Sequence, residues 1–136
     1  MTNSILLLIQ LTRNAYRRAS EDVLGMKVKA YMLLQNLREG AMPQAELPGC
    51  MHLDANNTVL LLNDLESKGF VERRRDPADR RRHIVAITEA GTKALARADR
   101  VMASLEAEVF ASLSPEEQAT FRDLLARAVA AEPAAV

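Results

Sequence analysis

The residues best suited to a chemical task lie in one short stretch, RRRDPADRRRH, which runs from Arg73 to His83. The chain of 136 residues has a formal net charge of zero, yet this stretch holds six of its 18 basic side chains and two of its 18 acidic ones. The remainder therefore carries 12 Lys and Arg against 16 Asp and Glu. Guanidinium groups at this density can bind phosphate oxygens, or they can pair locally with the two aspartates on a solvated surface.

Cys50 and His52 are the other residues that invite a chemical reading. They lie two apart, a spacing that does not point both side chains the same way on a helix. A zinc site needs about four ligands, and a nucleophile with its base needs an orienting group and an oxyanion hole. We therefore predict no catalytic residue, metal or cofactor, and keep a metal enzyme, a small hydrolase or a redox-active Cys50 as alternatives. A single cysteine forms no intrachain disulfide and favours a cytoplasmic location.

Apolar spacing predicts a mostly helical chain, with helices over about residues 4–20, 27–39, 55–68 and 89–112 and another after Ser114. Asp54 and Gly69 suit the start and stop of the third of these helices. Before Asp54 lies PQAELPGCMHL, a short helical piece that Pro48 and Gly49 should end early. The segments 70–73 and 83–87 are short and β-branched, and 76–79 has turn chemistry, so the Arg-rich stretch is predicted to be the tip of a hairpin.

This order of elements is typical of a winged helix-turn-helix carried on additional helices. The predicted fold is mainly α with a small β-hairpin wing, formed as a single domain over residues 1–136. The apolar run at 5–9 is too short to span a bilayer. Alternating steps of three and four, the spacing of a helix-packing seam, separate Leu95, Ala98, Met102, Leu105 and Val109. So small a domain cannot bury this seam by itself, so we predict a homodimer.

The chain also resembles the MarR family of bacterial transcription regulators, through PQAEL, LDANNTVLLLNDLESKGFVERR and DPADRRRHIVAITEAG. The family pattern has Gly-Phe/Leu-Val-x-Arg, then Asp-x-Arg, then a strand that ends in Leu/Ile-Thr-x-x-Gly. The positions that match are Gly69, Phe70, Val71, Arg73, Asp79, Arg81, Ile87, Thr88 and Gly91. The resemblance implies a winged-helix DNA-binding region at about 26–90 and dimerisation helices at about 1–22 and 89–132. The expected seam comprises Leu8, Leu11, Leu95, Met102, Leu105, Val109, Phe121 and Leu124.

The implied function is that of a DNA-binding regulator, not an enzyme, whose partner is a pseudo-palindromic double-stranded operator. A repressor relieved by a small, aromatic ligand is the form we expect. The wing residues implied are Arg73, Arg74, Arg75, Asp79, Arg80, Arg81 and Arg82, with Arg81 in the minor groove and Asp79 holding it. The other arginines would be phosphate contacts or structural pairs.

The recognition helix implied by the resemblance would present Ala55, Asn56, Asn57, Val59, Leu60 and Asn63 to the major groove. Asn can read adenine, and Val or Leu can touch a thymine methyl group. Many relatives carry a basic residue near Ala55 and an Arg at Leu60, and this helix instead has a net acidic charge. The wing is therefore expected to supply much of the electrostatic affinity. The alternative is a ligand-sensing or protein-interaction module of the same fold with weak DNA binding.

A ligand pocket is expected from residues on the first two long helices: Arg13, Tyr16, Arg17, Val28, Tyr31 and Met32. An Arg beside a Tyr could bind an aromatic carboxylate. Ordinary packing with solvated arginines explains the same residues equally well.

Overall fold

The computed structural model describes residues 2–51 and 53–131 and consists mainly of helices. In chain order the elements are α1 (Ser4–Arg18), α2 (Glu21–Leu24), α3 (Val28–Asn36), β1 (Met42–Pro43), a 3₁₀ turn (Gln44–Glu46), α4 (Leu47–Met51), α5 (Ala55–Ser67), β2 (Val71–Arg75), β3 (His83–Ile87), α6 (Glu89–Val109) and α7 (Pro115–Ala130). The predicted winged helix-turn-helix with additional helices is confirmed. No helix within the described residues is long and apolar enough to cross a membrane.

The predicted helix boundaries have the expected capping chemistry. Asp54 caps α5 by accepting a hydrogen bond of 2.7 Å from the backbone N–H of Asn57, and Gly69 follows the helix with a φ of +77°. Thr88 caps α6 through the N–H of Gly91 at 3.0 Å. Ser114 and Glu117 form a reciprocal capping box at the start of α7, with distances of 2.9 and 3.1 Å. These local signals explain why the sequence located the elements.

The three strands form one antiparallel sheet in the order β1-β3-β2. The hairpin pairs Val71 with Ile87 at its base and Arg75 with His83 near its tip. The short β1 pairs along the other side of β3, with Met42 opposite Val85. We did not predict β1, because two residues are too few to show a strand period.

The core of the winged-helix body surrounds α3, whose Leu33 and Leu34 are fully buried. Leu62 and Leu65 of α5 are also fully buried, and the hairpin adds Val71 and Val85. Side chains of α6 close the same core, so the first half of this long helix belongs to the body. The opposite face of α5 remains in solvent.

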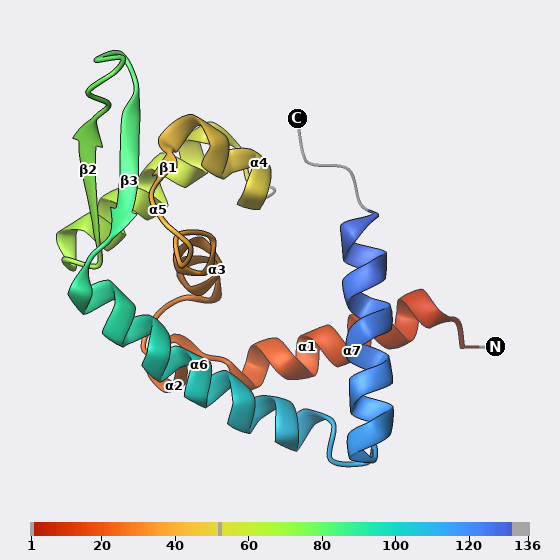
Figure 1. Ribbon diagram of the computed structural model, residues 1–136. Helices are drawn as coiled ribbons and strands as arrows, with labels where there is room; N and C mark the ends of the chain where they lie inside the picture. Colours follow the sequence, from red (N-terminus) through yellow and green to blue (C-terminus); the bar gives the residue numbers. More distant parts are fainter. Residues whose placement is uncertain (1, 52, 132–136) are drawn as a thin grey trace.

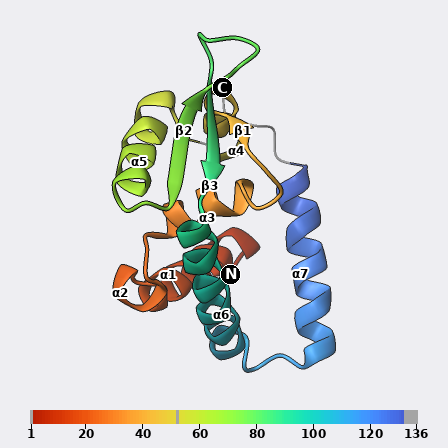
Figure 2. The ribbon, with the colours of Figure 1, turned by 60° about the vertical axis from the view of Figure 1, so that its left-hand side comes forward.

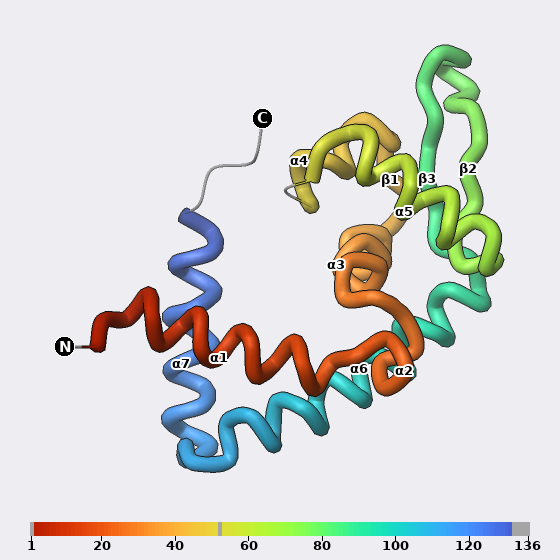
Figure 3. Tube along the Cα trace, turned by 180° about the vertical axis from the view of Figure 1, so that it is seen from behind, coloured from red at the N-terminus to blue at the C-terminus, as the bar shows by residue number. Residues whose placement is uncertain are grey.

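Beyond the body, α6 continues as an arm toward α1 and α7 (Figure 1). Figures 2 and 3 show α7 standing apart from the winged-helix body, beyond the far end of α6. Arg18 binds Glu108 at 2.9 Å and Arg122 lies 3.3 Å from Glu106, so ion pairs tie both helices to α6. Many apolar side chains of α1 and α7 nonetheless remain exposed in the single chain, among them Ile5, Leu6, Leu7, Leu8, Ile9, Leu124 and Val129.

Three sequence expectations need correction. Pro48 and Gly49 do not end the helical piece early but lie inside α4, because proline is tolerated in the first turn of a helix. The single-turn α2 was not predicted, and the first helix ends at Arg18 instead of about residue 20. Leu95 was assigned to the dimer seam, but its side chain is 3% exposed within its own subunit and cannot reach a partner.

Candidate nucleic-acid interface

Hydrogen bonds made by two aspartates, Asp76 and Asp79, fix the backbone of the hairpin tip. Asp76 Oδ1 accepts a hydrogen bond from the N–H of Ala78 at 2.9 Å, and the Asp76 N–H donates to the carbonyl of Arg82 at 2.9 Å. The carbonyl of Asp79 in turn accepts from the N–H of Arg82 at 2.9 Å. These turns close the end of the hairpin, which extends beyond the helices of the winged-helix body (Figure 2).

The predicted pairing of Asp79 with Arg81 is confirmed. Asp79 Oδ1 accepts hydrogen bonds from the backbone N–H of Arg81 at 3.1 Å and from its Nε at 3.2 Å. These bonds, first the backbone and then the side-chain one, lower the pKa of Asp79 below its ordinary value. The bond to Asp79 orients one edge of the Arg81 guanidinium. The rest of the group is open to solvent, because the Arg81 side chain is 91% exposed.

Arg73 has a different task from the arginines of the tip. Its Nη2 donates to Asn63 Oδ1 at 2.6 Å and to Glu66 Oε1 at 2.8 Å, and its side chain is only 19% exposed. The hydrogen bond from Arg73 lowers the pKa of Glu66. Of the two roles left open for Arg73, the contacts favour the structural pair, which docks β2 against α5.

The remaining arginines differ in how firmly they are held. Arg75 Nη1 donates to the carbonyl of Arg80 at 2.8 Å across the hairpin. Arg74 lies 3.7 Å from Glu72, with both side chains more than half exposed. Arg80 and Arg82 are exposed, and their side chains make no ion pair or hydrogen bond with the described part of the chain. The tip thus presents free guanidinium groups on a backbone that is itself tied down.

All six residues predicted for the recognition face of α5 are exposed: Ala55, Asn56, Asn57, Val59, Leu60 and Asn63. The three asparagines are not equivalent, however. Asn57 Nδ2 donates to Asp54 Oδ2 at 3.0 Å, and Asn63 Oδ1 is taken by Arg73. Asn56 makes no side-chain hydrogen bond within the described residues, so both its donor and its acceptor are available to a base edge.

Helix α5 and the wing border a common hollow of about 370 Å³. Ala55 and Val59 line it from α5, and Arg81, Arg82 and His83 line it from the wing. The chain therefore brings the first turns of the exposed helix and the arginines of the tip to one surface.

A polar cluster at the junction of α3 and α6 escaped the sequence analysis. The Tyr31 hydroxyl donates to Asp99 Oδ1 at 2.6 Å, and Arg38 Nη2 donates to Asp99 Oδ2 at 2.8 Å. Burial, followed by the bond to Asp99 and its charge, raises the pKa of Tyr31 to about 12. Burial raises the pKa of Asp99, but the hydrogen bonds from Tyr31 and Arg38 outweigh it and leave that pKa below its ordinary value. Asp99 lies 68 positions from Tyr31 and 61 from Arg38 in the sequence, so no local sequence pattern predicts this cluster.

The expected ligand residues are only partly brought together. Tyr16, Val28 and Tyr31 line a hollow of about 490 Å³ between α1, α3, α6 and α7, whereas Arg13, Arg17 and Met32 do not line it. Among the described residues that line this hollow, Glu106 is the only charged one. The Arg–Tyr pair proposed for an aromatic carboxylate is therefore not assembled there.

The remaining seam residues lie on three helices around this hollow. Leu8, Leu11, Met102, Leu105 and Val109 all line it. Phe121 packs its ring against Phe110 with centroids 5.3 Å apart, and Leu124 is 54% exposed. Their use in a dimer stays a prediction. The predicted dimerisation helices extend to about residue 132, which lies outside the described residues.

Cys50 is exposed on α4, and its suggested partner His52 lies outside the described residues. Within the described ranges no three His, Cys, Asp or Glu side chains are grouped to hold a metal ion. The described residues therefore give no structural support for a metal or catalytic site at Cys50 and His52.

Comparison with known proteins shows the same fold and the same sequence pattern. The MarR family model matches residues 29–83. The chain is 33% identical over 104 residues to a protein of Thauera aromatica provisionally named as the transcriptional regulatory protein for the hcr operon, and 42% identical over 65 residues to the transcriptional regulator HosA of Escherichia coli O111:H-. These matches cover 76% and 48% of this chain, and the chain spans 63% and 48% of the length of those relatives.

Two solved structures extend the likeness to nearly the whole chain. A mutant of MarR from E. coli complexed with operator DNA has a TM-score of 0.77 and 25% identity, with 90% of each chain covered. The PcaV transcriptional regulator from Streptomyces coelicolor, in complex with its natural ligand, has a TM-score of 0.79 and 26% identity, with 96% of this chain and 94% of that chain covered. In sequence pattern, element order and overall fold, this chain is therefore similar to proteins of the MarR family.

Proposed function

We propose that the protein is a homodimeric regulator of transcription that binds double-stranded DNA through α5 and the hairpin wing. The observation that carries this proposal is the common surface formed by the exposed start of α5 and the arginines of the tip. An α-helix fits the major groove, and arginines are attracted to the negative potential of a narrow minor groove. The named functions of the relatives and the operator complex of the similar MarR structure support the same reading.

In the proposed complex Arg81 enters the minor groove and Asp79 orients it. Arg74, Arg80 and Arg82 contact phosphates, Arg73 holds β2 against α5, and Arg75 fixes the hairpin. On α5, Asn56 is the proposed reader of a base edge, with Val59 and Leu60 available to thymine methyl groups. Because α5 carries Asp64 and Glu66, the wing supplies most of the electrostatic affinity, so binding should depend strongly on salt.

Dimerisation is proposed through the exposed apolar side chains of α1 and α7 together with the far end of α6. Apolar side chains exposed in such number mark an interaction surface. A two-fold dimer would bind a pseudo-palindromic duplex with half-sites about one helical turn apart. We propose further that the protein is a cytoplasmic repressor, not an enzyme, and that a small ligand relieves repression.

The test is a fluorescence-anisotropy titration of the protein against duplex DNA from upstream of its own gene. A random duplex of equal length serves as the control, and both are measured at two salt concentrations. We expect tighter binding to the upstream DNA, and an affinity that falls steeply with salt for both duplexes. Equal affinity for the two duplexes would overturn the proposal and favour a ligand-sensing or protein-interaction module of the same fold.

A further inference from the structure

The exposed face of α5 carries two large apolar side chains that the fold leaves uncovered. Val59 is 37% exposed and Leu60 is 58% exposed, although the opposite face of the same helix is buried in the core. Val59 lines the hollow of about 370 Å³ that α5 shares with Arg81 and Arg82 of the wing. Apolar surface in this position is costly in water, and its burial against a bound partner is favourable.

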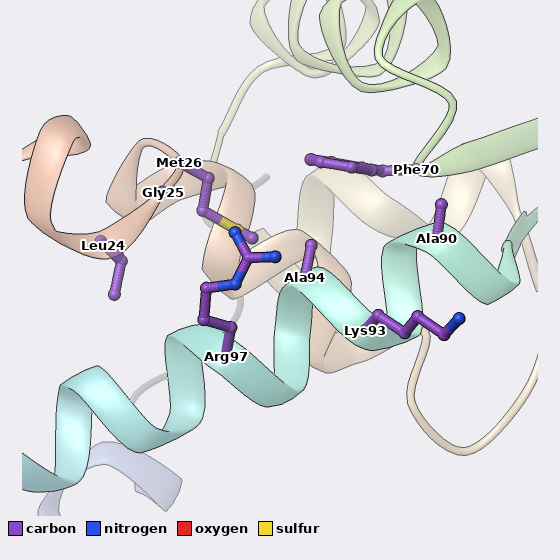
Figure 4. A pocket seen from close by; sticks show the side chains of 8 residues that line it. All are labelled: Leu24, Gly25, Met26, Phe70, Ala90, Lys93, Ala94 and Arg97. Atoms are coloured by element: carbon purple, nitrogen blue, oxygen red, sulfur yellow. The ribbon is translucent and has the colours of Figure 1, made fainter.

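These two are the only large apolar side chains that are exposed among the described residues of α5 and the wing. Just past the other end of the helix, Phe70 packs against the buried core. It lines a hollow of about 290 Å³ together with Ala90 and Ala94 of α6 (Figure 4). The fold therefore packs the large apolar side chain that leads into β2, but it leaves uncovered those on the face proposed to meet DNA.

The exposed face of α5 lacks the kind of side chain that usually reads guanine. Guanine presents two acceptors, N7 and O6, in the major groove, and its common reader is an Arg or Lys that donates to both. Helix α5, all of which lies within the described residues, contains neither. Arg73 lies against the helix, but its guanidinium is bound to Asn63 and Glu66. Lys68 follows the last turn, away from the wing hollow, and lies 3.3 Å from Asp64.

An A·T pair matches what this face does offer. Thymine carries a 5-methyl group on its major-groove edge, and adenine presents one donor and one acceptor there. Val59 and Leu60 can pack on the methyl group, while the free amide of Asn56 can bind the adenine. Asn56 and Leu60 are four residues apart and therefore lie on one side of the helix, so both can reach neighbouring base pairs.

The wing favours the same base composition from the other groove. A-tracts have a narrow minor groove with an enhanced negative potential, which attracts an inserted arginine. Arg81, oriented by Asp79 and 91% exposed, is the arginine proposed to enter that groove. Because Arg81 and Val59 line one hollow, α5 and the wing would meet A·T pairs in adjacent grooves.

We propose that the protein recognises A·T-rich half-sites through the 5-methyl groups of thymine, which Leu60 and Val59 bury in the major groove. The methyl group, instead of a hydrogen bond to guanine, is then the main determinant of sequence under α5. Because 5-methylcytosine carries its methyl group at the corresponding ring position, it substitutes for thymine better than cytosine does, and uracil substitutes poorly. This inference rests on the proposed function and specifies the sequence class of the operator.

The first test is a selection of duplexes by the full-length protein from a pool with a randomised centre. We expect A·T pairs to dominate the enriched half-sites. An invariant guanine as the main determinant of each half-site would overturn this inference but leave the proposed function standing. The absence of any enriched sequence would overturn the proposed function and this inference with it.

The second test compares the selected duplex with one in which deoxyuridine replaces the half-site thymines. Uracil pairs with adenine as thymine does, so the exchange removes only the methyl groups. Anisotropy titrations should show a loss of about fourfold for each buried methyl group, and about fifteenfold for one such group in each half-site of a dimer. Where cytosine replaces a sensitive thymine, 5-methylation should recover part of the lost affinity.

Variants of α5 assign the methyl contact to its side chains. Leu60→Ala and Val59→Ala remove apolar surface that is exposed in the free protein, so the melting temperature should change little. At least one of them should bring the ratio of the affinities for the thymine and uracil duplexes toward one. Arg74→Gln is the control, because a lost phosphate contact should weaken both duplexes equally and leave the ratio unchanged. Equal affinity of the unaltered protein for the two duplexes, or an unchanged ratio in both α5 variants, would overturn the proposal.

Discussion

Arg73 on β2 and Asn63 on α5 share a hydrogen bond of 2.6 Å, which joins the wing to the exposed helix beside it. The same guanidinium binds Glu66 one turn further along α5. Arg73 is thus bound within the protein, where it fixes the relative position of α5 and the wing, the two elements proposed to bind DNA. The arginines therefore divide into positioning and contacting residues, a difference that mutations can separate.

Replacing Arg73 with Gln should lower both the melting temperature, by a few degrees, and the affinity for DNA, because α5 and β2 lose their link. Arg74→Gln is the matched control on the same strand, where the side chain is more than half exposed. It should reduce only DNA affinity and its salt dependence, by about one unit of the log–log slope. Melting curves and anisotropy titrations check both variants. Equal melting temperatures for the two variants would contradict the positioning role of Arg73.

Arg81→Ala should weaken binding to the upstream duplex about tenfold while leaving the dimer and its melting temperature intact. The guanidinium is 91% exposed, so nothing in the fold depends on it except the bond to Asp79. Asp79→Asn should have a smaller effect, because an amide oxygen can still accept from the Arg81 N–H but without the charge. Anisotropy at fixed salt measures both effects. Unchanged affinity in Arg81→Ala would count against a groove contact.

Asn56→Ala and Asn57→Ala should behave differently although the residues are adjacent. Asn56 has a free amide, so its loss should relax discrimination at one base pair, at a cost of about 1–3 kcal/mol. The Asn57 side chain binds Asp54 at the start of α5, so its loss should chiefly affect the helix end. Binding measured against a set of duplexes with single base-pair changes distinguishes the two. Equal loss of discrimination in both variants would refute the assignment of Asn56.

Leu124→Asp should convert the dimer to monomers, because a carboxylate would be buried at the partner surface without a counter-charge. Leu124 is 54% exposed in the single chain, so the substitution leaves the fold of one subunit unchanged. Ala126→Asp on another face of α7 is the control and should remain dimeric. Analytical ultracentrifugation measures both. A stable dimer of the Leu124 variant would exclude this part of α7 from the interface.

Tyr31 should ionise well above the ordinary value near 10, since its pKa is raised to about 12 by burial and by Asp99. The folded protein keeps a proton that the unfolded chain loses near pH 10. The free energy of unfolding should therefore fall as pH rises from about 10 toward 12, whereas this contribution is fully present below pH 10.

Tyrosinate absorbance in a Tyr16→Phe variant isolates the titration of Tyr31. We expect a higher midpoint in the folded protein than in denaturant, and a lower midpoint when Asp99→Asn is added, because the carboxylate charge is gone. Identical midpoints in the folded and denatured states would show that the contact between α3 and α6 does not persist in solution.

The sequence alone determined most of the helix ends and turns that depend on neighbours along the chain. Helix starts at Asp54, Thr88 and Ser114, the stop at Gly69 and the arginine-bearing hairpin are all local signals, because caps and turns form between residues a few positions apart. The same local reasoning was wrong at Pro48, since whether a proline ends or begins a helix depends on where the helix starts.

Only the tertiary structure decided which side chains are available. It buries Leu95 in its own subunit, ties Arg73 to Asn63 and Glu66, and separates Arg13 and Arg17 from the hollow they were expected to line. It also gathers Tyr31, Arg38 and Asp99 across long stretches of sequence. Such contacts arise from how helices pack and cross, and a periodic pattern records which face of a helix is apolar but not what that face meets.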